Sequence, residues 1–355
     1  MDTTLQVSSL ARFPRARLRK GVLALIPLWF AAGCEGGTGE VVNVYTHRHY
    51  DADQRLFDRF TERTGIDVRV VTASADELIT RMEREWDLSP ADLLITVDAG
   101  RLHRAMELGL LRSVRSRVLS EVIPAPLRDP EGYWFGLTQR ARVLIYGLDR
   151  VDPSELSTYE DLAEPKWNGR VLVRTSENIY NLSLLASIIA ANGPEAAEEW
   201  ARGVVANLAR PPQGNDTDQV LDVAAGVGDV AIVNTYYVGR LLNDRDSAAR
   251  ELASQVGVFF PNKGGRGAHM NVSGAGVAAF APNPENAIRL LEFLVSEEAQ
   301  RVFAETIFEY PVREDVPWAS TLQDWGRFQA DTLNLRRLGE LNREAVMIFD
   351  RAGWR

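Results

Sequence analysis

Apolar and polar positions along the chain repeat with periods that alternate between those of strands and helices. Val41–Tyr45 predicts a strand, and from Asp53 to Thr64 the apolar residues recur three and four positions apart, which predicts a helix. Ile66–Val71 alternates as a second strand, and Ala75–Trp86 returns to the helical period. Pro90–Val97 is almost wholly apolar, as in a buried parallel strand. This alternation indicates a doubly wound α/β fold.

The same pattern divides the rest of the chain. Residues 134–147 predict one or two longer strands that could cross to another lobe, and Pro284–Phe303 predicts one long amphipathic helix. The last 40 residues are expected to be largely helical. We expect further strands at Val171–Val173, Asp229–Val233, Val256–Phe260 and Ala275–Phe280, and further helices within Leu156–Trp167 and at Leu182–Ala191, Pro194–Leu208 and Gln219–Ala225.

Residues 1–33 are expected to be a signal peptide. Basic residues from Arg12 to Lys20 precede the apolar run Val22–Ala32, which is too short to span a bilayer. Cys34 is the only cysteine, and its place after small residues is similar to a bacterial lipobox, in which the thiol is lipidated. An ordinary signal peptide with an incidental cysteine is the alternative. Residues 34–40 are Gly-rich and would form a flexible tether.

Length and charge narrow the class of protein. The chain has 355 residues, enough for two lobes, and 45% hydrophobic with 25% charged residues is typical of a soluble globular protein. Removing residues 1–33 takes five basic residues from 40 and one acidic residue from 49, which leaves 35 and 48 and a net charge of −13. This balance argues against a nucleic-acid partner, which needs a basic face, and mildly favours cations.

Tyrosines carry the candidate chemistry. Tyr236 and Tyr237 follow the apolar stretch 230–235, and His49 and Tyr50 follow the first predicted strand. A free tyrosine is protonated at neutral pH because its pKa is about 10. A trivalent ion such as Fe(III), which prefers hard anionic oxygen, lowers that pKa and displaces the proton. Neighbours on a strand point to opposite faces, so a bend or a helix start after Thr235 would be needed for both phenols to reach one ion.

The chain resembles the bacterial periplasmic ferric-iron-binding proteins, and most closely the branch that binds iron through a cluster of tyrosines. The segments that carry the resemblance are Asn43–Asp53, Pro90–Asp98, Glu177–Asn181 and Val233–Leu241, and the match extends over essentially the whole chain after the signal peptide. The resemblance implies that Tyr50, Tyr180, Tyr236 and Tyr237 are iron ligands, with His49 as a fifth ligand or a neighbour.

The resemblance also implies an α/β, two-lobed periplasmic-binding-protein fold of the type II, Venus-flytrap kind, with a hinge of crossing strands. One lobe is expected from 41–136 and 268–316, and the other from 137–267 and 317–355. His49 and Tyr50 would come from the first lobe and the other tyrosines from the second, so that the ion ties the closed lobes together. The protein would be a monomeric extracytoplasmic receptor, lipid-anchored to the membrane, that delivers ferric ion to an inner-membrane ABC permease.

Several alternatives stay open. His47 could replace His49, and carbonate or citrate held by an arginine could complete the shell, the candidates being Arg101, Arg140, Arg142 and Arg240. The ion could arrive as bare Fe(III), as a chelate or partly as Fe(II), and the membrane that carries the anchor is undecided. We assign Tyr45, Tyr146 and Tyr159 to packing, and His103 and His269 to the surface or to loops.

Two other functions compete with iron capture. The same fold could bind a small organic ligand such as a polyamine, thiamine or a sugar, and that role would need aromatic stacking and acidic groups rather than phenolates. An exported iron oxidoreductase would need an open coordination position for its substrate. The sequence favours a binding protein that is not an enzyme.

Overall fold

The computed structural model of the protein describes residues 40–48 and 50–355. The expected signal peptide, Cys34, residues 34–39 of the tether and His49 lie outside the described residues.

A mixed sheet begins with parallel strands, as the sequence predicts. β1 (Val41–Thr46) lies between β2 (Asp67–Thr72) and β3 (Leu93–Val97), and it is parallel to both. β8 (Met270–Val277) then pairs with β3 in the antiparallel sense and leads to β4 (Phe135–Gly147). The strand order is β2-β1-β3-β8-β4 in this part of the sheet.

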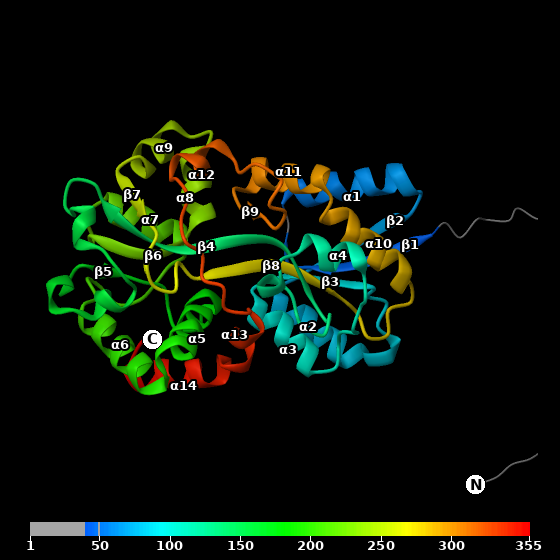
Figure 1. The fold of residues 1–355 in the computed structure, drawn as a ribbon, viewed down its shortest axis with the longest axis horizontal. Helices are drawn as coiled ribbons and strands as arrows, with labels where there is room; N and C mark the ends of the chain where they lie inside the picture. Colours follow the sequence, from blue (N-terminus) through cyan, green and yellow to red (C-terminus); the bar gives the residue numbers. More distant parts are fainter. Residues whose placement is uncertain (1–39, 49) are drawn as a thin grey trace, which may run out of the picture. The chain divides into compact units, whose positions relative to one another are not determined.

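The long strand β4 continues into a second group of strands. Its last residues pair with β6 (Val230–Asn234) and β7 (Val256–Phe259), and β5 (Val171–Leu172) joins β6 in parallel. β9 (Tyr310–Pro311) pairs with the middle of β4. Figure 1 shows β4 and β8 side by side at the centre, between the two groups of strands and helices.

Helices cover both groups of strands. We call β1–β3, β8 and the helices around them the first half, and β5–β7 with their helices the second half. In the first half lie α1 (Asp51–Thr64), α2 (Ala75–Glu85), α3 (Ala99–Glu107), α4 (Arg117–Val122), α10 (Pro284–Leu294) and α11 (Glu297–Ile307). In the second half lie α5 (Ile179–Asn192), α6 (Pro194–Ala206), α7 (Asp216–Ala224), α8 (Thr235–Leu242), α9 (Ser247–Ala253), α12 (Ser320–Asp324) and α14 (Asn342–Ala352).

Shorter elements complete the described chain. Helix α13 (Arg336–Glu340) packs against both α3 and α5. Single 3-10 turns are found at η1 (Trp86–Leu88), η2 (Ala125–Leu127), η3 (Pro153–Glu155), η4 (Glu160–Ala163) and η5 (Pro165–Trp167). In the described part of the chain, none of the helices is both long and apolar enough to cross a membrane.

Most predicted elements are present, but three were placed wrongly. The helix expected within Leu156–Trp167 is instead the pair of 3-10 turns η4 and η5, because Pro165 interrupts the helical backbone. The strand expected at Ala275–Phe280 is β8, which begins earlier and ends at Val277. The single helix expected at Pro284–Phe303 is divided into α10 and α11, because the Ser296 side chain accepts a hydrogen bond from Ala299 N and caps a new helix.

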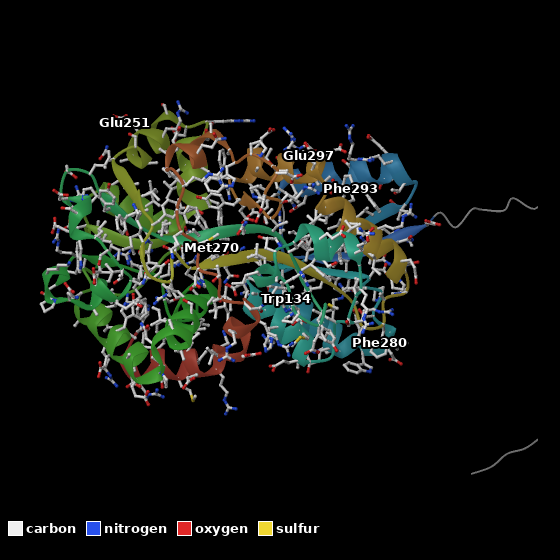
Figure 2. All side chains as sticks on the ribbon, viewed as in Figure 1. Trp134, Glu251, Met270, Phe280, Phe293 and Glu297 are labelled. Atoms are coloured by element: carbon white, nitrogen blue, oxygen red, sulfur yellow. The ribbon has the colours of Figure 1, made fainter. Side chains whose placement is uncertain are left out.

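The core follows the crossing strands. Trp134 is fully buried and Met270 is nearly so, and both lie among packed side chains beside β4 and β8, whereas Glu251 of α9 lies on the outside (Figure 2).

A buried ion pair stabilises the second half. Asp216, at the start of α7, accepts hydrogen bonds from Arg142 Nη1 at 2.6 Å and from Asn234 N at 2.8 Å, and it therefore joins α7, β4 and β6.

We expect Asp216→Ala to lower the free energy of unfolding by about 3–5 kcal/mol, because it leaves the buried guanidinium of Arg142 without its partner. Urea unfolding of the full chain measures this change. Glu121→Ala is the matched control, since Glu121 pairs with Arg117 on the surface and such pairs contribute about 0–1 kcal/mol. Equal losses for the two variants would contradict the role given to Asp216.

Candidate metal centre

The adjacent tyrosines lie at the start of a helix. Helix α8 begins at Thr235, directly after β6, so the backbone changes from extended to helical just before Tyr236 and Tyr237. Their ring centres are 4.2 Å apart, and the ring of Tyr236 is buried while that of Tyr237 is half-buried. Successive residues of a helix are about 100° apart around its axis, so both phenols can face the same region. The helix start after Thr235, one of the two geometries considered from the sequence, is therefore present.

Tyr180 also lies at a helix start. It occupies the first turn of α5, where the side chain of Asn178 accepts a hydrogen bond from Tyr180 N at 3.1 Å. The helix predicted at Leu182–Ala191 begins earlier in the structure, at Ile179, and therefore includes Tyr180. Its phenol oxygen lies 3.3 Å from that of Tyr236. Two helices of the second half thus bring phenols from distant parts of the chain into hydrogen-bond distance.

Tyr50 comes from the first half. It is the residue that precedes α1, just beyond the end of β1. The guanidinium carbon of Arg240, on the same helix as Tyr236, lies 5.8 Å from the centre of the Tyr50 ring. The phenol of Tyr50 is close enough to those of Tyr180 and Tyr236 for a negative charge on one to raise the pKa of another. We call Tyr50, Tyr180, Tyr236 and Tyr237 the tyrosine cluster.

Arginines surround this cluster. Arg48 lies 5.3 Å from the centre of the Tyr50 ring, and the Tyr180 ring has three guanidinium carbons within 5.3–5.7 Å, those of Arg140, Arg142 and Arg174. Cations near aromatic rings and phenol oxygens favour negative charge on those oxygens. The surroundings are therefore suited to phenolates once the protons have left.

Arg140 has two unused donors among the described residues, whereas Arg48, Arg142 and Arg174 have one each. Its side chain is fully buried, and its Nη1 donates to Ser273 Oγ at 3.1 Å. Among the described residues, its Nε and Nη2 have no hydrogen-bond acceptor. A buried donor without an acceptor is costly, so these groups are placed to meet an anionic oxygen, either a phenolate or a carboxylate. Of the other arginines considered as anion ligands, Arg101 pairs with Asp76 at 3.2 Å and Arg142 pairs with Asp216.

Without a metal, Tyr50, Tyr236 and Tyr237 hold their protons firmly. Burial, followed by the nearby charge of Glu309, raises the pKa of Tyr50 to about 12. Burial, followed by the charge of Tyr180, raises the pKa of Tyr237, and the same two causes raise the pKa of Tyr236 well above its ordinary value. All three are therefore neutral at physiological pH, and only a strongly polarising cation can displace their protons.

Other donor types do not form a competing site in this part of the chain. In residues 40–48 and 50–355, no group of three or more His, Cys, Asp or Glu side chains is arranged to hold a metal ion. Tyr45 and Tyr159 are buried in the core, as predicted, and each hydroxyl has a hydrogen-bond partner there: the Tyr45 hydroxyl donates to Glu85, and the Tyr159 hydroxyl donates to the backbone oxygen of Arg142. Tyr146 is half-buried against the main core.

Both histidines assigned to the surface or to loops are buried: His103 lies in a helix, so that assignment was wrong, whereas His269 does lie in the irregular segment just before β8. His103 is buried on α3, because Gly339 of α13 lets the two helices approach so closely that a Cβ at position 339 would overlap the His103 side chain. His269 is buried beside β8, where its backbone N donates to the Tyr159 hydroxyl at 3.0 Å. Burial, with the nearby arginine charges, lowers the pKa of His269 to about 3, so its imidazole is neutral.

Besides Arg174, sequence reasoning missed four charged residues around the cluster. Arg48 and Asp53 form a buried ion pair at 2.9 Å, and Glu309 accepts a hydrogen bond from Ser273 Oγ at 3.0 Å. Asp98, which directly follows the buried segment 90–97, is fully buried as well. A charged residue that directly follows an apolar strand was an available signal for Asp98, whereas only the three-dimensional fold shows the surroundings of Glu309.

Comparison with known proteins gives a consistent result. Residues 55–330 match the family model of bacterial extracellular solute-binding proteins. Iron uptake protein A1 of Synechocystis is 49% identical over 319 residues, which are 90% of this chain and 89% of that protein.

Solved structures agree with this assignment. A Trichodesmium protein called IdiA or FutA, in complex with iron and citrate ligands, has a TM-score of 0.87 at 51% identity, with 89% of this chain and 100% of that chain covered. For a ferric binding protein from Campylobacter jejuni the TM-score is 0.84 at 41% identity, with 88% and 100% covered. The chain therefore belongs to the family of bacterial extracellular solute-binding proteins and has the two-lobed type II fold of its ferric-binding members.

Proposed function

We propose that this protein captures ferric ion through the phenolates of Tyr50, Tyr180, Tyr236 and Tyr237, and delivers it to an ABC permease in the inner membrane. The observation that carries the proposal is the convergence of these phenols from both halves of the molecule, with Tyr180 and Tyr236 oxygens 3.3 Å apart. The iron and citrate bound to the Trichodesmium relative support the same ligand class. His49 is retained as a candidate fifth ligand, since it adjoins Tyr50 in the sequence.

Charge explains why a trivalent ion suits this site. Four phenolates carry four negative charges, and Fe(III) offsets three of them. The remaining charge would lie among the guanidinium groups of Arg48, Arg140 and Arg240. A divalent ion would leave more negative charge in a buried region and would displace the phenol protons less readily. The unused donors of Arg140 could also hold a carboxylate of citrate or a carbonate ion as part of the coordination shell.

We further propose that the lobes are 41–136 with 268–316 and 137–267 with 317–355, and that they close on the ion as in other two-lobed receptors. The family description supports an extracytoplasmic location. Lipidation of Cys34 would keep the receptor near its permease. We infer a binding role without turnover, because its relatives are named as uptake and binding proteins and because protein ligands that fill the coordination shell leave no position for a substrate.

Iron loading should colour the protein, because phenolate-to-iron charge transfer absorbs visible light. We expect Tyr236→Phe and Tyr180→Phe to weaken the visible band and to lower the iron content after loading with ferric citrate. Tyr146→Phe is the matched control, since Tyr146 lies on β4 among core residues and outside the tyrosine cluster. Absorbance and metal analysis on the same samples measure both effects. A colourless wild-type protein, or three variants that load equally, would refute the assignment.

Iron retention should fall as the pH falls. Tyr50, Tyr236 and Tyr237 each release one proton when they become ligands, since their raised pKa values keep them neutral without the metal, so acid shifts the equilibrium toward the free protein. The visible band, followed during acid titration at fixed citrate concentration, measures this loss. Tyr237→Phe should reduce the slope of iron affinity against pH by about one proton. Retention that does not change with pH would contradict phenolate coordination.

A further inference from the structure

Asp98 has an unusual backbone conformation for its residue type. It is the residue that precedes α3, and its backbone has φ 82° and ψ 129°, a combination that residues other than glycine seldom adopt. Residues held in such conformations are overdetermined by their surroundings and concentrate at functional sites. The tyrosine cluster does not include Asp98, so this conformation calls for another explanation.

The buried carboxylate of Asp98 accepts hydrogen bonds from three different elements. Gly100 N donates at 2.9 Å within α3, Asn271 Nδ2 donates at 2.7 Å from the crossing strand β8, and Ser183 Oγ donates at 2.6 Å from α5. The first two donors belong to the first half, whereas Ser183 belongs to the second half. The hydrogen bond between Asp98 and Ser183 therefore joins the two halves.

The helix held by this hydrogen bond is the one that carries Tyr180. Ser183 lies three residues after Tyr180, on the same face of α5. Gly100 of the facing helix lies close to this part of α5: a Cβ built there would be in van der Waals contact with Ile179 Cδ1 at 3.6 Å and with Ser183 Oγ at 3.8 Å. Residues on both sides of Tyr180 in α5 thus lie against the start of α3.

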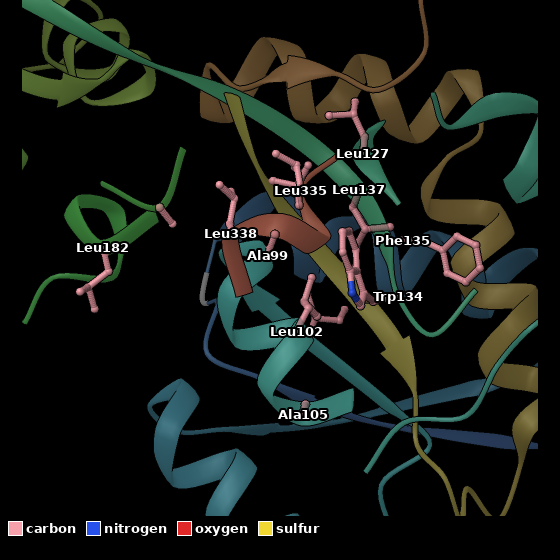
Figure 3. Packing of buried hydrophobic residues seen from close by; sticks show 14 of the residues in the cluster. Ala99, Leu102, Ala105, Leu127, Trp134, Phe135, Leu137, Leu182, Leu335 and Leu338 are labelled. Carbon is pink, nitrogen blue, oxygen red and sulfur yellow. The ribbon is translucent and has the colours of Figure 1, made fainter. Parts of the chain in front are cut away.

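Apolar contacts surround this polar one. In Figure 3, Leu338 of α13 lies near Ala99 and Leu102 of α3, and Leu182 of α5 lies on the opposite side of Leu338. Leu338 is fully buried, and α13 packs against both α3 and α5. Apolar contacts of this kind are not directional. The hydrogen bond to a charged acceptor, by contrast, fixes the position of α5 along α3.

We infer that Asp98 is a positioning residue for Tyr180: through Ser183 it holds the helix that carries Tyr180 against the half that carries Tyr50, and so slows the release of bound ferric ion. This inference rests on the proposed function. A contact made only while the halves are together stabilises that arrangement over any in which they separate. Asp98 does not touch the ion and acts through α5.

The chain offers a closely matched control for this contact. Ser187 lies one turn after Ser183 on α5 and is equally buried, but its hydroxyl donates to Leu184 O of its own helix at 2.7 Å. Ser183→Ala and Ser187→Ala each remove one buried hydroxyl from the same helix. Only the first removes a hydrogen bond between the halves.

The test measures iron release from the full protein. Each variant is loaded with ferric citrate and mixed with excess EDTA, and the loss of the visible band is followed with time. We expect Ser183→Ala to lose iron about tenfold faster, which corresponds to about 1.4 kcal/mol, with an unchanged band position and iron content. Ser187→Ala should match the wild type. Asp98→Asn should also accelerate release, since asparagine has nearly the same shape but accepts the hydrogen bond without a full charge.

A second measurement does not depend on iron. Small-angle scattering of the iron-free proteins should give a larger radius of gyration for Ser183→Ala than for Ser187→Ala. If the wild type binds iron and the two serine variants agree in release rate and in scattering, the positioning role of Asp98 is wrong. If both variants release iron faster by the same factor, the cause is a general loosening of α5, and the positioning role is again wrong. If the wild type binds no iron while scattering still separates the variants, the contact stands and the proposed function fails.

Discussion

Buried phenols that keep their protons until a strongly polarising ion arrives are the constraint on which the rest of the site depends. Burial raises the pKa of Tyr50, Tyr236 and Tyr237, so the empty site carries no charge on these oxygens. The guanidinium groups around the cluster therefore stabilise negative charge only when the ion is bound, because the phenols become phenolates only when the ion displaces their protons. The same arginines need counter-charges in the empty state, and Asp53 and Asp216 supply them at 2.9 and 2.6 Å.

The fold serves this constraint by placing tyrosines where the backbone changes direction. Tyr50 precedes α1, Tyr180 begins α5, and Tyr236 and Tyr237 begin α8. Tyr180 is further held by the Asn178 side chain, which caps α5 and accepts a hydrogen bond from Tyr180 N, whereas α1 and α8 begin without a side-chain cap. At these helix starts the backbone N–H groups also favour negative charge. Helix starts are therefore suitable places for ligands that must become anions.

Local sequence determined much of this architecture. The strand–helix order of the first 60 residues after the tether could be predicted because it depends on nearby residues, whereas the sequence left a bend and a helix start after Thr235 as alternatives. The burial of His103 could have been found as well, since Ala99, Leu102 and His103 share one helical face. The contact between Asp98 and Ser183 could not, because the two residues are 85 positions apart and nothing in either local pattern indicates the other. Glu309 reaches Ser273 and Thr138 only through tertiary packing.

The ladder between the two crossing strands is interrupted at one residue. Gly136 of β4 pairs with Gly274 and Thr138 with Ser273, so Leu137 has no opposite residue, and its carbonyl instead accepts a hydrogen bond from Gln300 of α11 at 2.7 Å. A bulge of this kind bends a strand and increases its local twist. The two ends of β4, which pair with strands of different halves, therefore diverge in direction at Leu137, on a strand that carries none of the four phenols.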